Sequence, residues 1–247
     1  MVRVFLLFVS LLFGGLTAAR SEPVMLVAAD GVKVFGTFWP AVDKGAPLIL
    51  AFHQAGSSHA EYTPLAPRLN RAGFGVLAID QRSGGGEFGG KNKTVATLGR
   101  SAAYDAALLD LEAALAWGRL RAQGAPLLVW GSSYSAALVF LLAAHHPADV
   151  QGLLAFSPGE YLATTDAVHD AARSLRLPVF VTQSSDTDEI EQSRSLVTAL
   201  PGAEKTLFIA RRGVHGSSTL RADRNSAGAE ENWAAALGFL ARFKPGR

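Results

Sequence analysis

Cysteine is absent from the 247 residues of the chain. Its absence excludes disulfide bonds, a thiol nucleophile, thiolate metal sites and lipid attachment at a signal-peptide cysteine. A chain of this length can stabilise its fold without covalent cross-links. Export without cysteine is therefore compatible with a bacterial periplasm.

An excess of charge of one sign is also missing. Lysine and arginine together number 23, aspartate and glutamate 21, and the formal net charge is +2. This balance provides no basic field for a nucleic acid, so no nucleic-acid partner is expected. The length fits one compact α/β domain, because such domains can reach about 250 residues.

The N-terminal apolar run, residues 4–16, is too short to span a membrane as a helix, which needs roughly 20 residues. It follows one cation, Arg3, and precedes small residues at 17–19. This order predicts a signal peptide over residues 1–19 and a single mature domain over 20–247. We therefore expect a secreted or periplasmic protein without stable membrane insertion; an uncleaved membrane anchor is the alternative.

Short apolar runs alternate with helical patterns through the rest of the chain. The runs lie at residues 48–53, 74–80, 127–130, 152–157, 177–183 and 205–210. Continuous runs of this kind are typical of strands buried on both faces of a parallel sheet. Two further runs flank Asp30-Gly31, the dipeptide of a tight hairpin turn. The chain thus predicts an α/β fold: a mostly parallel sheet with an antiparallel N-terminal hairpin and helices on both faces.

Polar segments follow several of these expected strands. They are "HQAGSS" after residue 52, "GSSYS" after residue 130, "SSDTDE" after residue 183 and "RRGVHGSS" after residue 210. The carboxyl ends of parallel strands carry the ligand site in open α/β sheets. A serine, several acids and a histidine are therefore expected to meet there.

The segment "GSSYS", Gly131 to Ser135, resembles the nucleophile elbow of the α/β-hydrolase family, Gly-x-Ser-x-Gly between a strand and a helix. Only the last glycine differs. The resemblance covers nearly the whole mature chain and implies the family's order of nucleophile, acid and histidine. Ser133 is then the nucleophile, because Gly131 and Ser135 put small residues at its crowded flanks. His215, just after the last strand, is the expected base.

The resemblance also implies an acid and two oxyanion donors. Asp186 is the preferred acid and Asp188 the alternative, since both follow the strand ending near residue 183. The backbone N–H of Tyr134 is expected to be one donor. Ala55 is expected to supply the second, with Gln54 as the alternative, because "HQAG" stands where the family often has His-Gly-x.

The expected function is hydrolysis of a carboxylic ester, or a related acyl compound, through a Ser-His-Asp triad and an acyl-enzyme. The partner would be a small-molecule ester, with no metal or organic cofactor. The segment 158–175 is too short for a cap domain, and in size the chain resembles dienelactone hydrolases, whose nucleophile is cysteine. The alternatives are a non-catalytic binding protein of this fold and an acyltransferase or peptidase using the same residues. The sequence indicates no oligomeric state.

Overall fold

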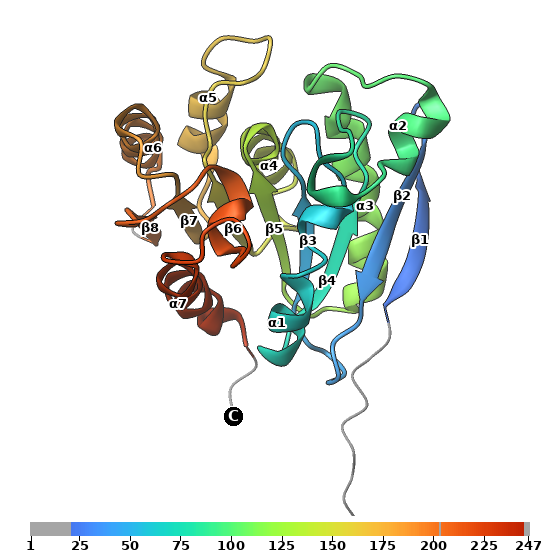
Figure 1. The fold of residues 1–247 in the computed structure, drawn as a ribbon, viewed down its shortest axis with the longest axis horizontal. Coiled ribbons are helices and arrows are strands. Elements are labelled where there is room, and N and C mark those ends of the chain that lie inside the picture. Colours follow the sequence, from blue (N-terminus) through green and yellow to red (C-terminus); the bar gives the residue numbers. More distant parts are fainter. Residues whose placement is uncertain (1–20, 203, 245–247) are drawn as a thin grey trace, which may run out of the picture.

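The computed structural model describes residues 21–202 and 204–244, which contain one eight-stranded sheet (Figure 1). The strands are β1 (Glu22–Val27), β2 (Lys33–Trp39), β3 (Leu48–Phe52), β4 (Gly75–Ile79), β5 (Leu127–Ser132), β6 (Gly152–Phe156), β7 (Val179–Thr182) and β8 (Lys205–Phe208). Their order across the sheet is β1-β2-β4-β3-β5-β6-β7-β8. The predicted signal peptide, residues 1–19, lies outside the described residues.

Pairing in this sheet is antiparallel at its first edge and parallel elsewhere. β1 pairs antiparallel with β2, and β2 pairs antiparallel with β4. The pairs from β4 through β3 to β8 are parallel. The prediction of a mostly parallel sheet with an antiparallel N-terminal hairpin is confirmed.

Helices cover both faces of the sheet. They are α1 (Ala66–Arg71), α2 (Lys93–Leu98), α3 (Leu108–Ala122), α4 (Tyr134–His145), α5 (Ala167–Ser174), α6 (Thr187–Ala199) and α7 (Ala229–Leu240). One core lies between the sheet and α3, α4, α5 and α6, and a second core lies between the sheet and α1 and α7. Strands β3 to β7, enclosed by both cores, are buried at every position, which explains their uninterrupted apolar runs.

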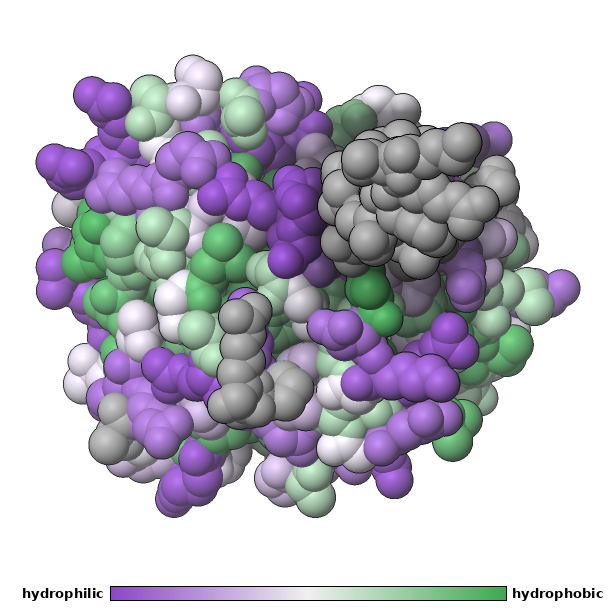
Figure 2. All heavy atoms as spheres, turned by 90° about the horizontal axis from the view of Figure 1, so that it is seen from below, coloured by the Kyte–Doolittle hydropathy of each residue, from purple (hydrophilic) through white to green (hydrophobic). Residues whose placement is uncertain are grey.

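The parallel strands carry their functional loops at one end. The segments that follow β3, β4, β5 and β6 run over the upper end of the sheet in Figure 1. Between β6 and β7 the chain forms only α5, so the prediction of no sizeable cap is confirmed. Figure 2 shows the opposite end, where hydrophilic residues surround smaller hydrophobic areas. In the part of the chain that the structure describes, no helix combines the length and apolar character needed to cross a membrane.

Candidate active site

Ser133 stands alone between β5 and α4, in a sharp strand-to-helix turn. Its backbone has φ 58° and ψ −124°, a conformation that non-glycine residues rarely adopt. Holding it there costs on the order of 1–3 kcal/mol, which the surrounding packing offsets. A Cβ at Gly131 would lie 2.3 Å from the carbonyl oxygen of Ser135, so only glycine fits at that flank. The turn therefore lifts one hydroxyl above the sheet.

Ser135 occupies the position at which the elbow pattern has its last glycine. The side chain is fully buried, and its Oγ donates to the His53 carbonyl oxygen at 2.6 Å. The same Oγ accepts from Gln81 Nε2 at 2.6 Å, and Gln81 Nε2 also donates to the Tyr134 hydroxyl at 2.9 Å. The Ser135 hydroxyl thus joins the first turn of α4 to the residues that follow β3 and β4.

His215 lies beside Ser133. Its Nε2 accepts from Ser133 Oγ at 2.8 Å, and the ring is held by a loop that folds tightly against the elbow. The next residue, Gly216, has φ +67°, and a Cβ there would lie 2.5 Å from Ser132 Oγ. Its N–H donates to Ser157 Oγ at 2.9 Å. The geometry thus pairs a strained serine with an imidazole that can accept its proton.

The partner of the other imidazole nitrogen is Glu189. Its Oε1 lies 2.8 Å from His215 Nδ1, and its Oε2 accepts from the Ser184 N–H at 3.1 Å. The prediction that Asp186 is the partner of His215 does not match this geometry. Its carboxylate caps α6, accepting from the N–H groups of Asp188 and Glu189 at 2.9 and 3.3 Å.

The alternative acid, Asp188, is an exposed first-turn residue of α6. The spacing Asp-x-x-Glu is a capping signal that places the aspartate at the N-cap and the glutamate on the third helical residue. This pattern, present at residues 186–189, is the sequence signal that Asp186 is used as a helix cap. In the structure the glutamate turns toward His215 instead of back to the cap.

The two partners shift each other's pKa. Burial opposes ionisation of Glu189, but hydrogen bonds from His215, from Ser157 and from the Ser184 N–H outweigh it and lower its pKa to about 2. The hydrogen bond and the charge of Glu189 raise the pKa of His215 above its ordinary value of 6.5, against the effect of burial. Glu189 is therefore a carboxylate at neutral pH and stabilises an imidazolium on His215.

The two expected oxyanion donors, the N–H groups of Tyr134 and Ala55, make no hydrogen bond to a described residue. Tyr134 is the first residue of α4, so its N–H has no acceptor within that helix. The Ala55 N–H donates to no described residue, whereas the Gln54 N–H donates to Glu61 Oε2 at 2.8 Å. Of the two candidates in this loop, Ala55 therefore has the free backbone donor. The Gln54 side chain donates to Glu87 Oε2 at 3.0 Å.

Comparison with known proteins finds the same fold in solved structures. The family model for serine aminopeptidase, S33, matches residues 44–163. An esterase of Pyrococcus furiosus superposes with a TM-score of 0.67 and 21% identity, over 91% of this chain and 93% of that one. A dienelactone hydrolase of Anabaena variabilis superposes with a TM-score of 0.71 and 17% identity, over 93% and 100%. The chain has the α/β-hydrolase fold.

A third solved structure extends the same comparison. A cold-adapted esterase from an Arctic intertidal metagenomic library superposes with a TM-score of 0.68 and 19% identity, over 92% of this chain and 95% of that one. No curated protein matches the sequence. Together with the family model, these structures support a hydrolase.

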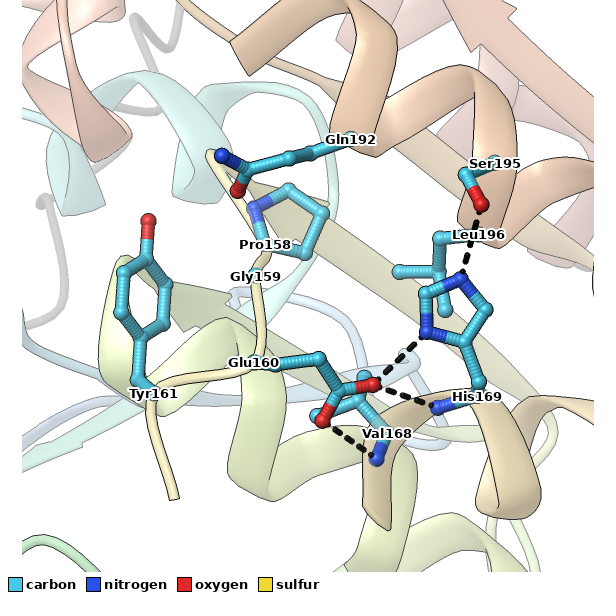
Figure 3. A pocket seen from close by; sticks show the side chains of 9 residues that line it. All are labelled: Pro158, Gly159, Glu160, Tyr161, Val168, His169, Gln192, Ser195 and Leu196. Atoms are coloured by element: carbon cyan, nitrogen blue, oxygen red, sulfur yellow. Dashed lines mark hydrogen bonds and ion pairs between the residues drawn. The ribbon is translucent and has the colours of Figure 1, made fainter. Parts of the chain in front are cut away.

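Two cavities lie near the Ser133–His215 pair, and His215 itself lines one of them. One, of about 370 Å³, has Tyr161 on its wall; the Tyr161 hydroxyl contacts Ser133 and donates to the Ser157 carbonyl oxygen at 3.2 Å. Its lining is Pro158, Gly159, Glu160, Tyr161, Val168, His169, Gln192, Ser195 and Leu196 (Figure 3). The other, of about 440 Å³, is lined by Gln54, Glu87, Phe88, Val214, His215, Ser218 and Arg224. Of the two, the second is lined by His215 and therefore opens directly onto the candidate site.

The first cavity contains a second Ser-His-Glu chain. His169 Nδ1 lies 2.7 Å from Glu160 Oε1, and its Nε2 lies 3.1 Å from Ser195 Oγ (Figure 3). Ser195 lies well inside α6, where backbone N–H groups are used within the helix, so no oxyanion donors stand beside it. The hydrogen-bonded series of Ser195, His169 and Glu160 therefore lines the cavity without the donors that acyl transfer needs.

Glu160, Asp166 and His169 are the described group best suited to hold a metal ion, since one ligand atom of each lies within 4.8 Å of the others. The Glu160 carboxylate, however, already accepts from His169 Nδ1 and from the N–H groups of Val168 and His169. These bonds tie the loop after β6 to the first turn of α5. The arrangement is explained by loop anchoring without an ion.

Proposed function

We propose that the protein is a serine hydrolase that cleaves carboxylic esters through an acyl-enzyme, with Ser133, His215 and Glu189 as its triad. One observation carries the proposal: Ser133 Oγ, the His215 ring and the Glu189 carboxylate form a continuous chain with both contacts at 2.8 Å. It begins at a strained serine, and the expected oxyanion donors, the Tyr134 and Ala55 N–H groups, are not used by other described residues. Nucleophile, base, orienting acid and oxyanion donors are the complete set for acyl transfer.

The proposed reaction has two halves. His215 Nε2 takes the Ser133 proton as Oγ attacks the ester carbonyl, and the Tyr134 and Ala55 N–H groups stabilise the developing oxyanion. The imidazolium then gives its proton to the leaving alcohol, which departs and leaves the acyl group on Ser133. A water molecule activated by His215 attacks this acyl group, and the carboxylic acid is released. Glu189 holds the Nδ1–H tautomer throughout.

Small esters fit the space around the triad. The cavity of about 440 Å³ that His215 lines has room for a modest acyl or alcohol group, and no cap domain encloses it. Two of the similar structures are esterases, which supports the same class. We expect p-nitrophenyl acetate and butyrate to be hydrolysed, and Ser133→Ala to abolish turnover. Ester turnover retained in a folded Ser133→Ala protein would refute the proposal.

An amide substrate is the second candidate, because the matching family model describes serine aminopeptidases. The same triad serves both classes, and the leaving group distinguishes them. Aminoacyl p-nitroanilides should be cleaved far more slowly than p-nitrophenyl esters if esters are the substrate class. A larger kcat/KM on the anilides would assign the peptidase function instead.

For the N-terminus we propose a signal peptide over residues 1–19 and export of the domain that follows. The order of one cation, an apolar run and small residues supports this proposal. The full chain should be recovered from the periplasm of a Gram-negative host with residue 20 as its N-terminus. Recovery of an uncleaved chain from the membrane fraction would support the anchor alternative.

A further inference from the structure

Glu61 is a fully buried acid that the proposed reaction does not use directly. It ends a short 3-10 helix, His59–Glu61, in the segment between β3 and α1. Its Oε1 accepts from Ser132 Oγ at 2.7 Å, and its Oε2 accepts from the Gln54 N–H at 2.8 Å. Ser132 directly precedes the nucleophile, and Gln54 directly precedes the Ala55 donor. One carboxylate therefore joins the two segments that carry the oxyanion donors.

The histidine loop is bound to the same group. The Ser217 N–H donates to Ser132 Oγ at 2.8 Å, and Ser217 Oγ accepts from Trp130 Nε1 at 2.9 Å. Ser217 lies two residues after His215. The Ser132 hydroxyl thus accepts from the histidine loop and donates to Glu61, so that elbow, oxyanion loop and histidine loop meet in one buried hydrogen-bonded cluster.

We propose that Glu61 is a positioning residue for hydrolysis, whose carboxylate fixes the elbow and the oxyanion loop so that the Tyr134 and Ala55 N–H groups converge on one oxygen. The inference rests on the proposed function. Oxyanion donors work only when they are held in place before the reaction, and errors of about 0.5 Å reduce their effect. The peptide unit that carries the Gln54 N–H and the unit that carries the Ala55 N–H are joined at Gln54 Cα, so moving the first moves the second.

The Glu61 carboxyl lies among several charged and titratable groups. Arg221 and Glu87 are the charged groups that act on the Glu61 carboxyl, with the Tyr62 and Tyr134 hydroxyls nearby. Burial raises the pKa of Glu61 to about 7, although hydrogen bonds from Ser132 and Gln54 and the charge of Arg221 act in the opposite direction.

At His215 the acting carboxylates are Glu189 and Glu61, and both raise the pKa of the imidazole. Arg224 and Glu87 share the cavity beside the ring. Removing the Glu61 charge should therefore lower the pH at which His215 loses its proton.

The Glu61→Gln variant tests the inference. The amide has one accepting oxygen, which the Gln54 N–H needs, so the NH₂ group faces Ser132 and the Ser132 hydroxyl can no longer donate to residue 61. We expect kcat on a p-nitrophenyl ester to fall about 100-fold, the size of effect seen when one oxyanion donor is lost. KM should change by less than about threefold, because the loss falls on the transition state. The acid limb of kcat/KM against pH should move to lower pH. Glu112→Gln, on α3, is the matched control and should behave as wild type.

Ser132→Ala provides a second variant that removes only one hydroxyl. Its kcat should fall about tenfold with little change in KM, and its effect should not add to that of Glu61→Gln, because both changes break the same contact. This variant decides the question if Glu61→Gln does not fold.

Two outcomes would overturn the inference while leaving the proposed function intact. One is a folded Glu61→Gln enzyme with kcat near wild type and an unmoved acid limb. The other is Ser132→Ala with wild-type kcat. A wild-type protein without esterase activity would instead refute the proposed function itself, so the two failures are distinguishable.

Discussion

Exchanging Glu189 for glutamine tests the triad at the point where the structure differs from the sequence-based expectation. Glu189 Oε1 lies 2.8 Å from His215 Nδ1, while Oε2 accepts from the Ser184 N–H at 3.1 Å. In Glu189→Gln the amide oxygen is needed by Ser184, so the NH₂ group faces Nδ1. The ring must then accept at Nδ1 and carry its proton on Nε2, the tautomer that cannot take the Ser133 proton.

The expected loss is large. Fixing the wrong tautomer by a carboxylate-to-amide exchange in such a triad lowers kcat by about 10⁴-fold, which corresponds to about 5.5 kcal/mol of activation free energy. Asp186→Asn is the matched control, because asparagine and aspartate cap helices about equally well. For that variant we expect kcat within about twofold of wild type and an unfolding free energy changed by less than about 0.5 kcal/mol.

The assay is steady-state hydrolysis of a p-nitrophenyl ester at pH 8, with circular dichroism to show that each variant is folded. Turnover by Glu189→Gln within tenfold of wild type would refute the reasoning. A 10⁴-fold loss in Asp186→Asn combined with an active Glu189→Gln would restore Asp186 as the acid.

Three further predictions follow from distances and pKa shifts. The raised pKa of His215 predicts that kcat/KM falls as pH drops through a value above 6.5, because only the neutral ring accepts a proton; a pH–rate profile with a limb below 6.5 would contradict it. A methyl group at Gly131 would lie 2.3 Å from backbone, so Gly131→Ala should lower the unfolding free energy by about 1–3 kcal/mol in urea titrations; unchanged stability would show that the elbow can relax. Glu61 has its pKa raised by burial from 4.5 to about 7, so its contribution to stability is complete below pH 4.5 and is lost as pH rises to 7. Because the unfolded chain ionises at lower pH than the folded one, the loss of unfolding free energy is roughly 3 kcal/mol. Urea titrations at pH 5 and pH 8 should show this loss in the wild type and not in Glu61→Gln.

The architecture was predictable because each part of it is encoded locally. Continuous apolar runs marked the strands, and Asp30-Gly31 marked the hairpin, as the antiparallel pairing of β1 and β2 shows. The elbow was recognisable for the same reason: the crowded backbone around Ser133 admits only small flanking residues, which leave a short sequence pattern.

The carboxylate that contacts His215 was not predicted from the sequence, because two acids stand within one turn of each other at the start of α6. Asp186 lies nearer the strand end, but its side chain is consumed by the N-terminal N–H groups of α6. Glu189, one turn along, reaches His215. Strand spacing alone does not resolve this choice. The capping pattern indicates that Asp186 is used at the cap, and only the fold brings Glu189 to His215.

The role of Glu61 had no local signal. Its partners, Ser132 and Gln54, are brought to it by the order of strands in the sheet, with β3 beside β5. A glutamate in a polar stretch of sequence usually lies on the surface, and only the fold buries this one.

Covalent labelling of Ser133 tests the central claim most directly. The mature protein is treated with a fluorophosphonate, its intact mass is measured, and the adduct is located by peptide mapping in wild type, Ser133→Ala and His215→Ala. The account predicts one adduct on the Ser133 peptide, none in Ser133→Ala, and much slower labelling in His215→Ala. Absence of an adduct in the folded wild type, or labelling at a rate unaffected by His215, would contradict it and favour a binding protein of this fold.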